Sequence, residues 1–233
     1  MAILDADGVN ARPVSIAIAI PSHEHAPVQF AMDLGLMMSY TSSLLPEEVS
    51  IGISMCVNTY IHKARQELLE SLLDSNITHI LWLDSDMSFP PETLVQLMSR
   101  DVDFVGVNYS QRSNPPGFVG IKRGGWHQSG EIGQALETNE ESTGLESCDA
   151  LGFGAFLMRT DALSALPEGD PWFWYERANG YHMGEDVYFC RLLQTLGHTI
   201  YCDHDLSKEC AHIGSFQFRT SHAEAYARAM KED

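Results

Sequence analysis

Positive charge is scarce in this chain of 233 residues. Lys and Arg number 14 against 32 Asp and Glu, which gives a net charge of −18 with neutral histidines. A charge of this sign and size repels nucleic-acid phosphates and anionic membrane surfaces, so it argues against nonspecific binding to either. It does not exclude a local basic spot, for which Arg112, Lys122 and Arg123 are the candidates.

Long apolar runs and regularly spaced cysteines are also missing. The run from Val14 to Ile20 is too short to cross a bilayer, so we expect no transmembrane segment. The number of cysteines is odd, and none of them form a Cys-x-x-Cys pattern. This usage predicts reduced thiols in a cytoplasmic protein. The cysteines are Cys56, Cys148, Cys190, Cys202 and Cys210.

What the chain does contain is an alternation of strand-like and helix-like patterns. This alternation predicts one α/β domain in which helices cover both faces of a mixed, mainly parallel sheet. Residues 1–12 are predicted to be a lead-in, 109–147 a flexible insertion with short strands, and 215–233 a C-terminal helical segment. Strands are expected near 14–20, 49–55, 80–83, 103–108 and 199–203, and helices near 27–43, 58–73, 185–196 and 221–230. Pro21 is expected to end the first strand, and Pro91 to begin a helix after the third.

An apolar run from His79 to Leu83 ends in Asp84-Ser85-Asp86. Side chains alternate along a strand, so the two carboxylates are expected to project to the same side. Like charges at the edge of a core repel unless a cation lies between them or one is protonated. Because no Lys or Arg is close in sequence, the pattern favours a hard divalent ion, Mg²⁺ or Mn²⁺. The alternative is a solvated turn without chemistry.

Arg65 lies on the apolar stripe of the helix predicted over 58–73, where an unpaired charge is costly. An anionic ligand in the crevice beyond the strand ends would satisfy it, and guanidinium suits phosphate. The alternative is a snorkelling side chain, or an ion pair with a carboxylate at the edge of the core.

Gly184-Glu185-Asp186 places two carboxylates in the first turn of the helix expected over 185–196. The helix dipole favours their ionised form, which suits a general base, although acidic residues are common there for helix stability alone. Near the other end of the chain, His212 is a candidate ligand or a structural histidine. The repeated Cys-x-His of 202–204 and 210–212 leaves open a structural zinc site, but its spacing is unusual for one.

Four motifs occur in the order seen in GT-A-fold glycosyltransferases, which the chain resembles over about residues 14–214. The segment ILWLDSDMSFPPETLVQL (80–97) is especially similar to small family-2-type enzymes, including stand-alone ones of phages and bacteria. The resemblance implies a GT-A fold, which is Rossmann-like and typical of nucleotide-diphospho-sugar transferases. The motifs are Asp84-Ser85-Asp86, Gly152-Phe153-Gly154, Gly184-Glu185-Asp186 and His212.

The resemblance also implies roles for individual residues. The donor nucleotide sugar would be held by Pro21, Ser22, His23, Glu24 and Arg65, with Asp84 and Ser85 at the ribose or the water shell of the metal. Asp86 and His212, with Asp84, would hold Mn²⁺ or Mg²⁺, which would stabilise the diphosphate leaving group. Gly152 and Gly154 would let the backbone approach a sugar. Asp186 would deprotonate the acceptor hydroxyl in an inverting reaction, with Glu185 as its rival. Trp172, Trp174 and Tyr175 could stack on a sugar or belong to the core.

Departures from the family narrow the expected function. The Gln-x-x-Arg-Trp-like motif of processive synthases is absent, so polymer synthesis with membrane extrusion is not expected. A sugar-nucleotide-forming nucleotidyltransferase would carry a Gly-rich loop after the first strand, and Pro21 to His25 contains no glycine. A non-catalytic binding module stays open. So do the acceptor (glycan, protein, lipid, small molecule or modified DNA base), the donor and the oligomeric state.

Overall fold

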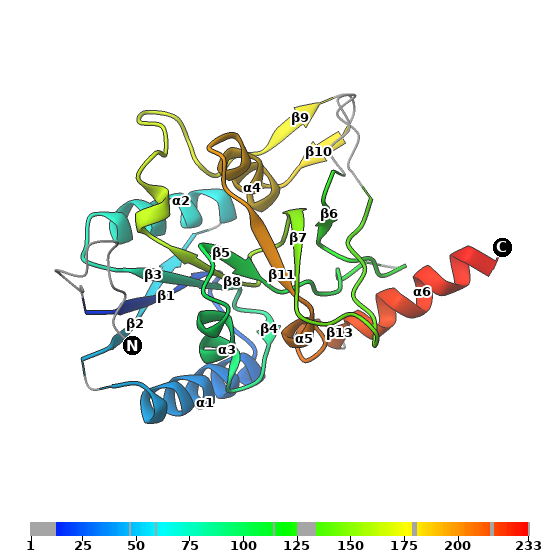
Figure 1. Cartoon of the computed structure of the whole chain (residues 1–233), viewed down its shortest axis with the longest axis horizontal. Coiled ribbons are helices and arrows are strands. Elements are labelled where there is room, and N and C mark those ends of the chain that lie inside the picture. The colour runs from blue at the N-terminus through cyan, green and yellow to red at the C-terminus, as the bar shows by residue number, and fades with distance from the viewer. Residues whose placement is uncertain are drawn as a thin grey trace.

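The computed structural model describes residues 13–46, 48–58, 60–113, 115–124, 134–178, 181–214 and 217–232. Within these residues the chain forms an α/β fold around a mixed sheet of eight strands, in the order β2-β1-β3-β8-β5-β11-β7-β6 (Figure 1). Pairing is parallel between β1 and β2, β1 and β3, and β5 and β11, and antiparallel elsewhere in this sheet. The strands are β1 (Ser15–Ser22), β2 (Ser50–Val57), β3 (His79–Leu83), β5 (Phe104–Gly106), β6 (Ile121–Lys122), β7 (Leu145–Ala150), β8 (Ala155–Arg159) and β11 (Ile200–Asp203).

Two apolar layers cover the sheet, as the alternation of patterns predicted. The sheet is mixed as expected but not mainly parallel, because β8 pairs antiparallel with both β3 and β5, and β7 pairs antiparallel with both β11 and β6. One contains Leu68, Leu69 and Leu72 of α2 (Ile61–Leu73) and Phe189 of α4 (Glu185–Thr195). The other contains buried residues of α1 (Val28–Leu44) and α3 (Thr93–Ser99). In Figure 1, α2 and α4 lie on one side of the sheet, and α1 and α3 on the other.

Two small antiparallel sheets complete the arrangement. One has the order β13-β12-β4, and the other pairs β9 with β10. The remaining elements are β4 (Met87–Ser88), η1 (Asp161–Leu163), β9 (Glu176–Ala178), β10 (Tyr181–Met183), α5 (His204–Ser207), β12 (Ala211–Ile213), β13 (Gln217–Arg219) and α6 (Thr220–Glu232). None of the helices among the described residues is long and apolar enough to cross a membrane.

Pro21 does not end the first strand as expected. The Val14 carbonyl accepts the N–H of Ser50 in β2, and the Ser22 carbonyl accepts the N–H of Asn58, directly after β2. The backbone N–H and C=O groups of even-numbered residues in β1 therefore point toward β2. Pro21 therefore faces the β3 side, where pairing of β1 with β3 ends at Ala19. Its missing N–H costs no ladder hydrogen bond there, and β1 continues to Ser22.

Two other expectations differ from the structure: the position of Pro91 relative to α3, and the flexibility of residues 109–147. Pro91 lies before α3 rather than at its first residue, because a turn precedes the N-cap Glu92. The described parts of 109–147 pack on the domain: Phe118, Leu136 and Thr138 are buried there, and Ile121 bridges to Ala135. Residues 1–12 and 125–133 lie outside the described part of the chain.

Candidate active site

Asp84 and Asp86 follow β3 at the carboxyl edge of the sheet, next to the end of the parallel strand β1. A turn holds them, in which the Met87 N–H donates to the Asp84 carbonyl at 3.1 Å. The Asp84 N–H donates to the Gly154 carbonyl at 3.1 Å, and the Asp86 carbonyl accepts from the Ile213 N–H at 2.7 Å. These backbone bonds tie three distant parts of the chain to one point.

Arg65 is buried, with 2% of its surface exposed, between carboxylates from two elements. Its Nη2 lies 2.8 Å from Asp84 Oδ1, and its Nε lies 3.2 Å from Glu185 Oε1. The guanidinium also lies 5.6 Å from the ring centroid of Trp82 and 5.3 Å from that of Phe153. Burial opposes its charge, but Asp84 and Glu185 raise the pKa of Arg65, so it stays ionised. This is the alternative of an ion pair at the edge of the core.

The expectation that no basic side chain balances the two aspartates is wrong. Arg65 pairs with Asp84, and Arg112 Nη2 lies 2.7 Å from Asp86 Oδ2. Both arginines are far from residues 84–86 along the chain, so sequence proximity gave no sign of them. Burial raises the pKa of Asp84, although Arg65 opposes the shift. Charge balance alone therefore does not require a metal ion at this site.

His212 lies beside Asp86 because β12 pairs with β4, with His212 opposite Met87. Its Nε2 lies 3.4 Å from Asp86 Oδ1, and its Nδ1 lies 3.2 Å from the Ser110 carbonyl oxygen. Burial raises the pKa of Asp86, but the hydrogen bond and charge of His212 and the charge of Arg112 outweigh it, so the net shift is downward.

The contact with Ser110 fixes the proton on His212, because a carbonyl oxygen can only accept. Nδ1 must therefore carry the hydrogen. When the imidazole is neutral, Nε2 presents a lone pair toward the Asp86 carboxylate, and two acceptors face each other at 3.4 Å. Only a second proton or a cation resolves this contact. Metal-ligating histidines usually donate their other ring N–H to a carboxylate, a backbone carbonyl or water, and the contact of Nδ1 with Ser110 has this form.

Tyr109 explains the two glycines of the Gly-Phe-Gly motif. A Cβ on Gly152 would lie 2.4 Å from the Tyr109 hydroxyl, and one on Gly154 would lie 2.7 Å from its ring. The hydroxyl accepts from the Gly154 N–H at 3.1 Å, and the ring lies edge-on to His212 with centroids 5.4 Å apart. The role predicted for these glycines, close approach to a sugar, is not what this packing shows. The absence of a side chain at both glycines leaves room for the ring of Tyr109.

Glu185 and Asp186 begin α4 after the N-cap Gly184. Glu185 is engaged by Arg65 and by the Tyr175 side chain. Asp186 accepts the Val187 N–H at 2.7 Å and is absent from the ion pairs among the described residues. Burial, followed by the charge of Glu185, raises the pKa of Asp186 to about 7. This is the range that suits a general base near neutral pH.

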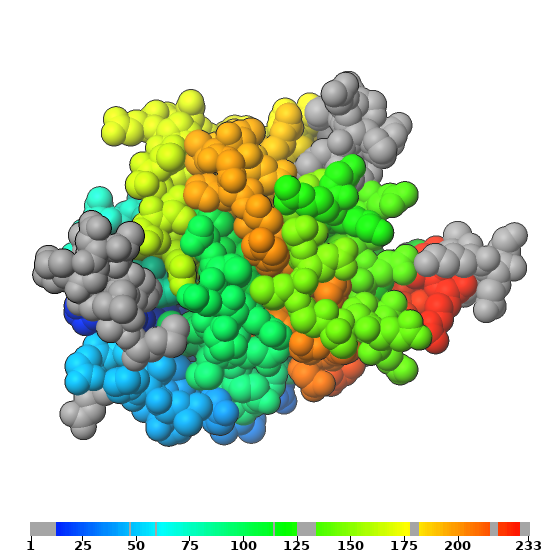
Figure 2. All heavy atoms as spheres, in the orientation of Figure 1, coloured from blue at the N-terminus to red at the C-terminus, as the bar shows by residue number. Residues whose placement is uncertain are grey.

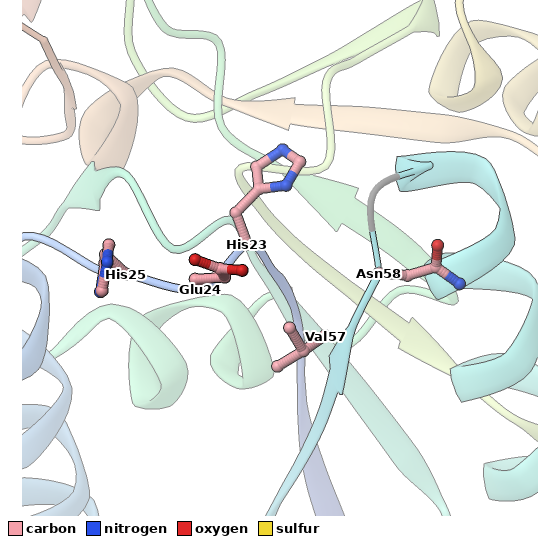
Figure 3. Close-up of a pocket in the computed structure, with 5 residues that line it drawn as sticks. All are labelled: His23, Glu24, His25, Val57 and Asn58. Atoms are coloured by element: carbon pink, nitrogen blue, oxygen red, sulfur yellow. The ribbon is translucent and has the colours of Figure 1, made fainter.

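A pocket of about 670 Å³ opens where the parallel strands β1 and β2 end. His23, Glu24 and His25 line it from the loop after β1, and Val57 and Asn58 from the end of β2 (Figure 3). His23 and Glu24 were expected to contact a nucleotide, and they do line the pocket. Pro21 and Ser22 are buried at the end of β1. Ser85 is half-buried in the turn between Asp84 and Asp86.

The predicted aromatic group divides in the structure. Trp172 packs against the core and donates through Nε1 to the Pro167 carbonyl at 2.9 Å. Trp174 and Tyr175 are exposed and surround His62 of α2. Tyr60 and His62 were missed by sequence reasoning, because nothing in the pattern links the start of α2 to residues 174 and 175.

The zinc alternative is not supported. Cys202 and Cys210 belong to the two apolar clusters on opposite sheet faces. His204 is satisfied by Thr138 Oγ1 at 2.9 Å and by Glu146 Oε2 at 3.0 Å. In the described part of the chain, no group of three or more His, Cys, Asp or Glu is arranged to hold a metal ion. A cation at Asp86 and His212 would therefore take further oxygen ligands from a substrate or water, and would displace Arg112.

No known family model matches the sequence, and no curated protein is similar to it. The fold is nevertheless recurrent, because 92 chains of solved structures match it. One is titled "Crystal Structure of A197 from STIV". It aligns with a TM-score of 0.57 and 15% identity over 86% of this chain and 86% of that one. At this identity the similarity concerns the α/β fold alone.

Proposed function

We propose that the chain is a metal-dependent glycosyltransferase of GT-A type, which moves a sugar from a nucleoside-diphosphate sugar to an acceptor hydroxyl. The observation that carries the proposal is the contact of His212 with Asp86. Nδ1 donates to the Ser110 carbonyl, so in the neutral imidazole the lone pair of Nε2 faces a carboxylate oxygen at 3.4 Å, a contact that a bound cation would resolve. Imidazole and carboxylate together suit Mn²⁺, and a carboxylate suits Mg²⁺.

The residues around Asp86 and His212 would have separate roles in binding the cation and the donor. Asp86 and His212 would hold the cation, and Asp84, fixed by Arg65, would orient its water shell or the ribose. A divalent cation bound there would neutralise the donor diphosphate and stabilise it as a leaving group. The pocket at His23, Glu24 and Asn58 offers space for the nucleoside at the ends of β1 and β2.

Asp186 is the proposed base. Glu185 is occupied by Arg65, whereas Asp186 keeps a carboxylate oxygen for the acceptor and has a pKa of about 7. It would take the acceptor proton as the acceptor oxygen attacks the anomeric carbon, with inversion of configuration. In a retaining enzyme the leaving diphosphate would accept this proton instead.

Calorimetric titration of UDP, GDP, CDP and dTDP, each with and without Mn²⁺, tests the assignment. One nucleotide should bind at least tenfold more tightly with Mn²⁺, and Asp86→Ala should abolish the difference. Asp103→Ala is the matched control, because Asp103 also faces an arginine, Arg159, at 3.6 Å, but lies directly before β5. If the wild-type protein binds a nucleotide with the same affinity with and without Mn²⁺, a nucleotide-binding module without metal chemistry is favoured instead.

A further inference from the structure

Four aromatic side chains gather at the start of α2 and in the segment before β9. His62 is the centre, with ring centroids 5.9 Å from Tyr60, 5.6 Å from Trp174 and 5.1 Å from Tyr175. The three outer rings are exposed: 59% of Tyr60, 49% of Trp174 and 48% of Tyr175 is open to solvent. We call this group the aromatic platform. Among the residues that the structure describes, most other Phe, Tyr and Trp rings are buried, so such a group of exposed rings is unusual there.

The aromatic platform borders the acid residues of α4. The Tyr175 hydroxyl is hydrogen bonded to Glu185, and burial together with the charge of this carboxylate raises the pKa of Tyr175 to about 12. Glu185 is in turn bound to Arg65, which lies one helical turn after His62 on α2. In Figure 2 the segment that precedes β9 forms part of the outer surface next to α4. A ligand on the platform therefore lies beside the residue pair that contains the proposed base.

We propose that the aromatic platform binds a pyranose ring, and that the acceptor is a saccharide. The assignment of this sugar as the acceptor rests on the proposed function. Aromatic faces pack against the C–H face of a pyranose, while the carboxylate oxygen that Asp186 keeps would accept a hydrogen bond from one of its hydroxyls. A neutral polyhydroxyl ligand is compatible with this acidic surface.

Phosphate-rich ligands fit this position poorly. The net charge is −18, and Glu185 and Asp186 lie beside the platform. A polyanion such as DNA would be repelled here. The pocket proposed for the nucleotide lies at the ends of β1 and β2, and Tyr60 of the platform donates its backbone N–H to the side chain of Asn58, which lines that pocket. The platform therefore adjoins the pocket, so a sugar on it would lie next to the donor.

Saturation-transfer NMR with methyl pyranosides of glucose, galactose, mannose and N-acetylglucosamine, and with their disaccharides, tests the proposal on the full chain without metal or nucleotide. At least one should receive saturation at its ring protons. Trp174→Ala should weaken its binding by about tenfold, the order expected for one aromatic contact. Tyr40→Ala is the matched control, because Tyr40 is an exposed ring on α1, across the sheet from α2.

The outcomes separate this proposal from the proposed function. Unchanged pyranoside binding by Trp174→Ala, or saturation of nucleosides in place of pyranosides, overturns the saccharide platform. If Mn²⁺-dependent nucleotide binding is present but no saccharide binds, only the platform proposal fails. If a saccharide binds through Trp174 and no nucleotide binds with or without Mn²⁺, the platform stands as a saccharide site and the glycosyltransferase proposal fails.

Discussion

Two pairs of acidic residues meet at one edge of this molecule, and the structure treats them differently. The strand pair, Asp84 and Asp86, receives an arginine for each member, with His212 added at Asp86. The helix pair, Glu185 and Asp186, shares one arginine, and it binds Glu185. As a result the pKa of Asp86 is lowered, whereas that of Asp186 rises to about 7. Similar carboxylates thus acquire different ionisation from their partners: Asp86 is held as an anion, and Asp186 keeps its proton to a higher pH.

The largest expected effect comes from removing the unpaired carboxylate of the helix pair. Asp186→Asn should lower the transfer rate by about 10²–10⁴-fold, the usual cost of losing a general base. Nucleotide and Mn²⁺ binding should be unchanged in the same calorimetric titration, because Asp186 lies outside the cation site. Glu185→Gln is the comparison and should be milder.

If Glu185→Gln abolishes transfer and Asp186→Asn does not, Glu185 rather than Asp186 is the general base. Unimpaired transfer in both variants would contradict a base on α4 and favour a retaining reaction. NMR of the anomeric configuration of the product distinguishes these cases.

The second effect concerns the arginine that joins both acid pairs. Arg65→Ala should cost about 3–5 kcal/mol in the free energy of unfolding, because it removes the positive charge that balances the Asp84 and Glu185 carboxylates in a buried site. Urea unfolding followed by circular dichroism measures it. Arg159→Ala removes an arginine that also faces two carboxylates, Asp101 and Asp103, but in a more exposed setting. It should cost less than about 1 kcal/mol. Equal costs for the two variants would mean that Arg65 is not the structural link between the pairs.

Features of the two acidic pairs that depend on neighbouring residues in the sequence were predictable, whereas those that depend on contacts between distant parts of the chain were not. The strands at 14–20 and 80–83 and the helices at 58–73 and 185–196 follow from local periodicity, so their positions were predictable to within a few residues. The acidic motifs were visible for the same reason. Arg112 was not assigned to Asp86, because this contact depends on a loop packing across the domain. The reason for Gly152 and Gly154 was also hidden, since it is the ring of Tyr109, more than 40 residues earlier.

A third test uses the raised pKa of Asp186. The folded state holds this proton up to about pH 7, and the ordinary value is 3.8, so between these values the folded state binds more protons than the unfolded chain. Stability therefore falls as the pH rises through this window. Asp186→Asn removes that cost, so its Tm should match the wild-type Tm near pH 4 and exceed it increasingly up to pH 7. A Tm difference that is constant across this range would mean that Asp186 does not titrate near neutrality in the folded protein.

A smaller effect is expected at the strand pair. The Arg112 side chain is 43% exposed and pairs with Asp86, so it would compete with a cation bound there. Arg112→Ala should therefore raise the affinity for Mn²⁺, by up to roughly fivefold given the ~1 kcal/mol upper value of exposed ion pairs. Isothermal calorimetry with Mn²⁺ alone measures it. Weaker Mn²⁺ binding in this variant would show that Arg112 supports the site rather than competing for it.

The most direct test is to observe whether Mn²⁺ reaches His212. In a ¹⁵N-histidine-labelled protein, substoichiometric Mn²⁺ should broaden the imidazole signals of His212, identified by their loss in His212→Gln. The signals of His204, whose two nitrogens already bind Thr138 and Glu146, should stay comparatively sharp. The same addition to Asp86→Ala should leave His212 sharp. If the His212 signals are unaffected by Mn²⁺ in the wild-type protein, with and without the nucleoside diphosphate, then Asp86 and His212 do not form a metal site.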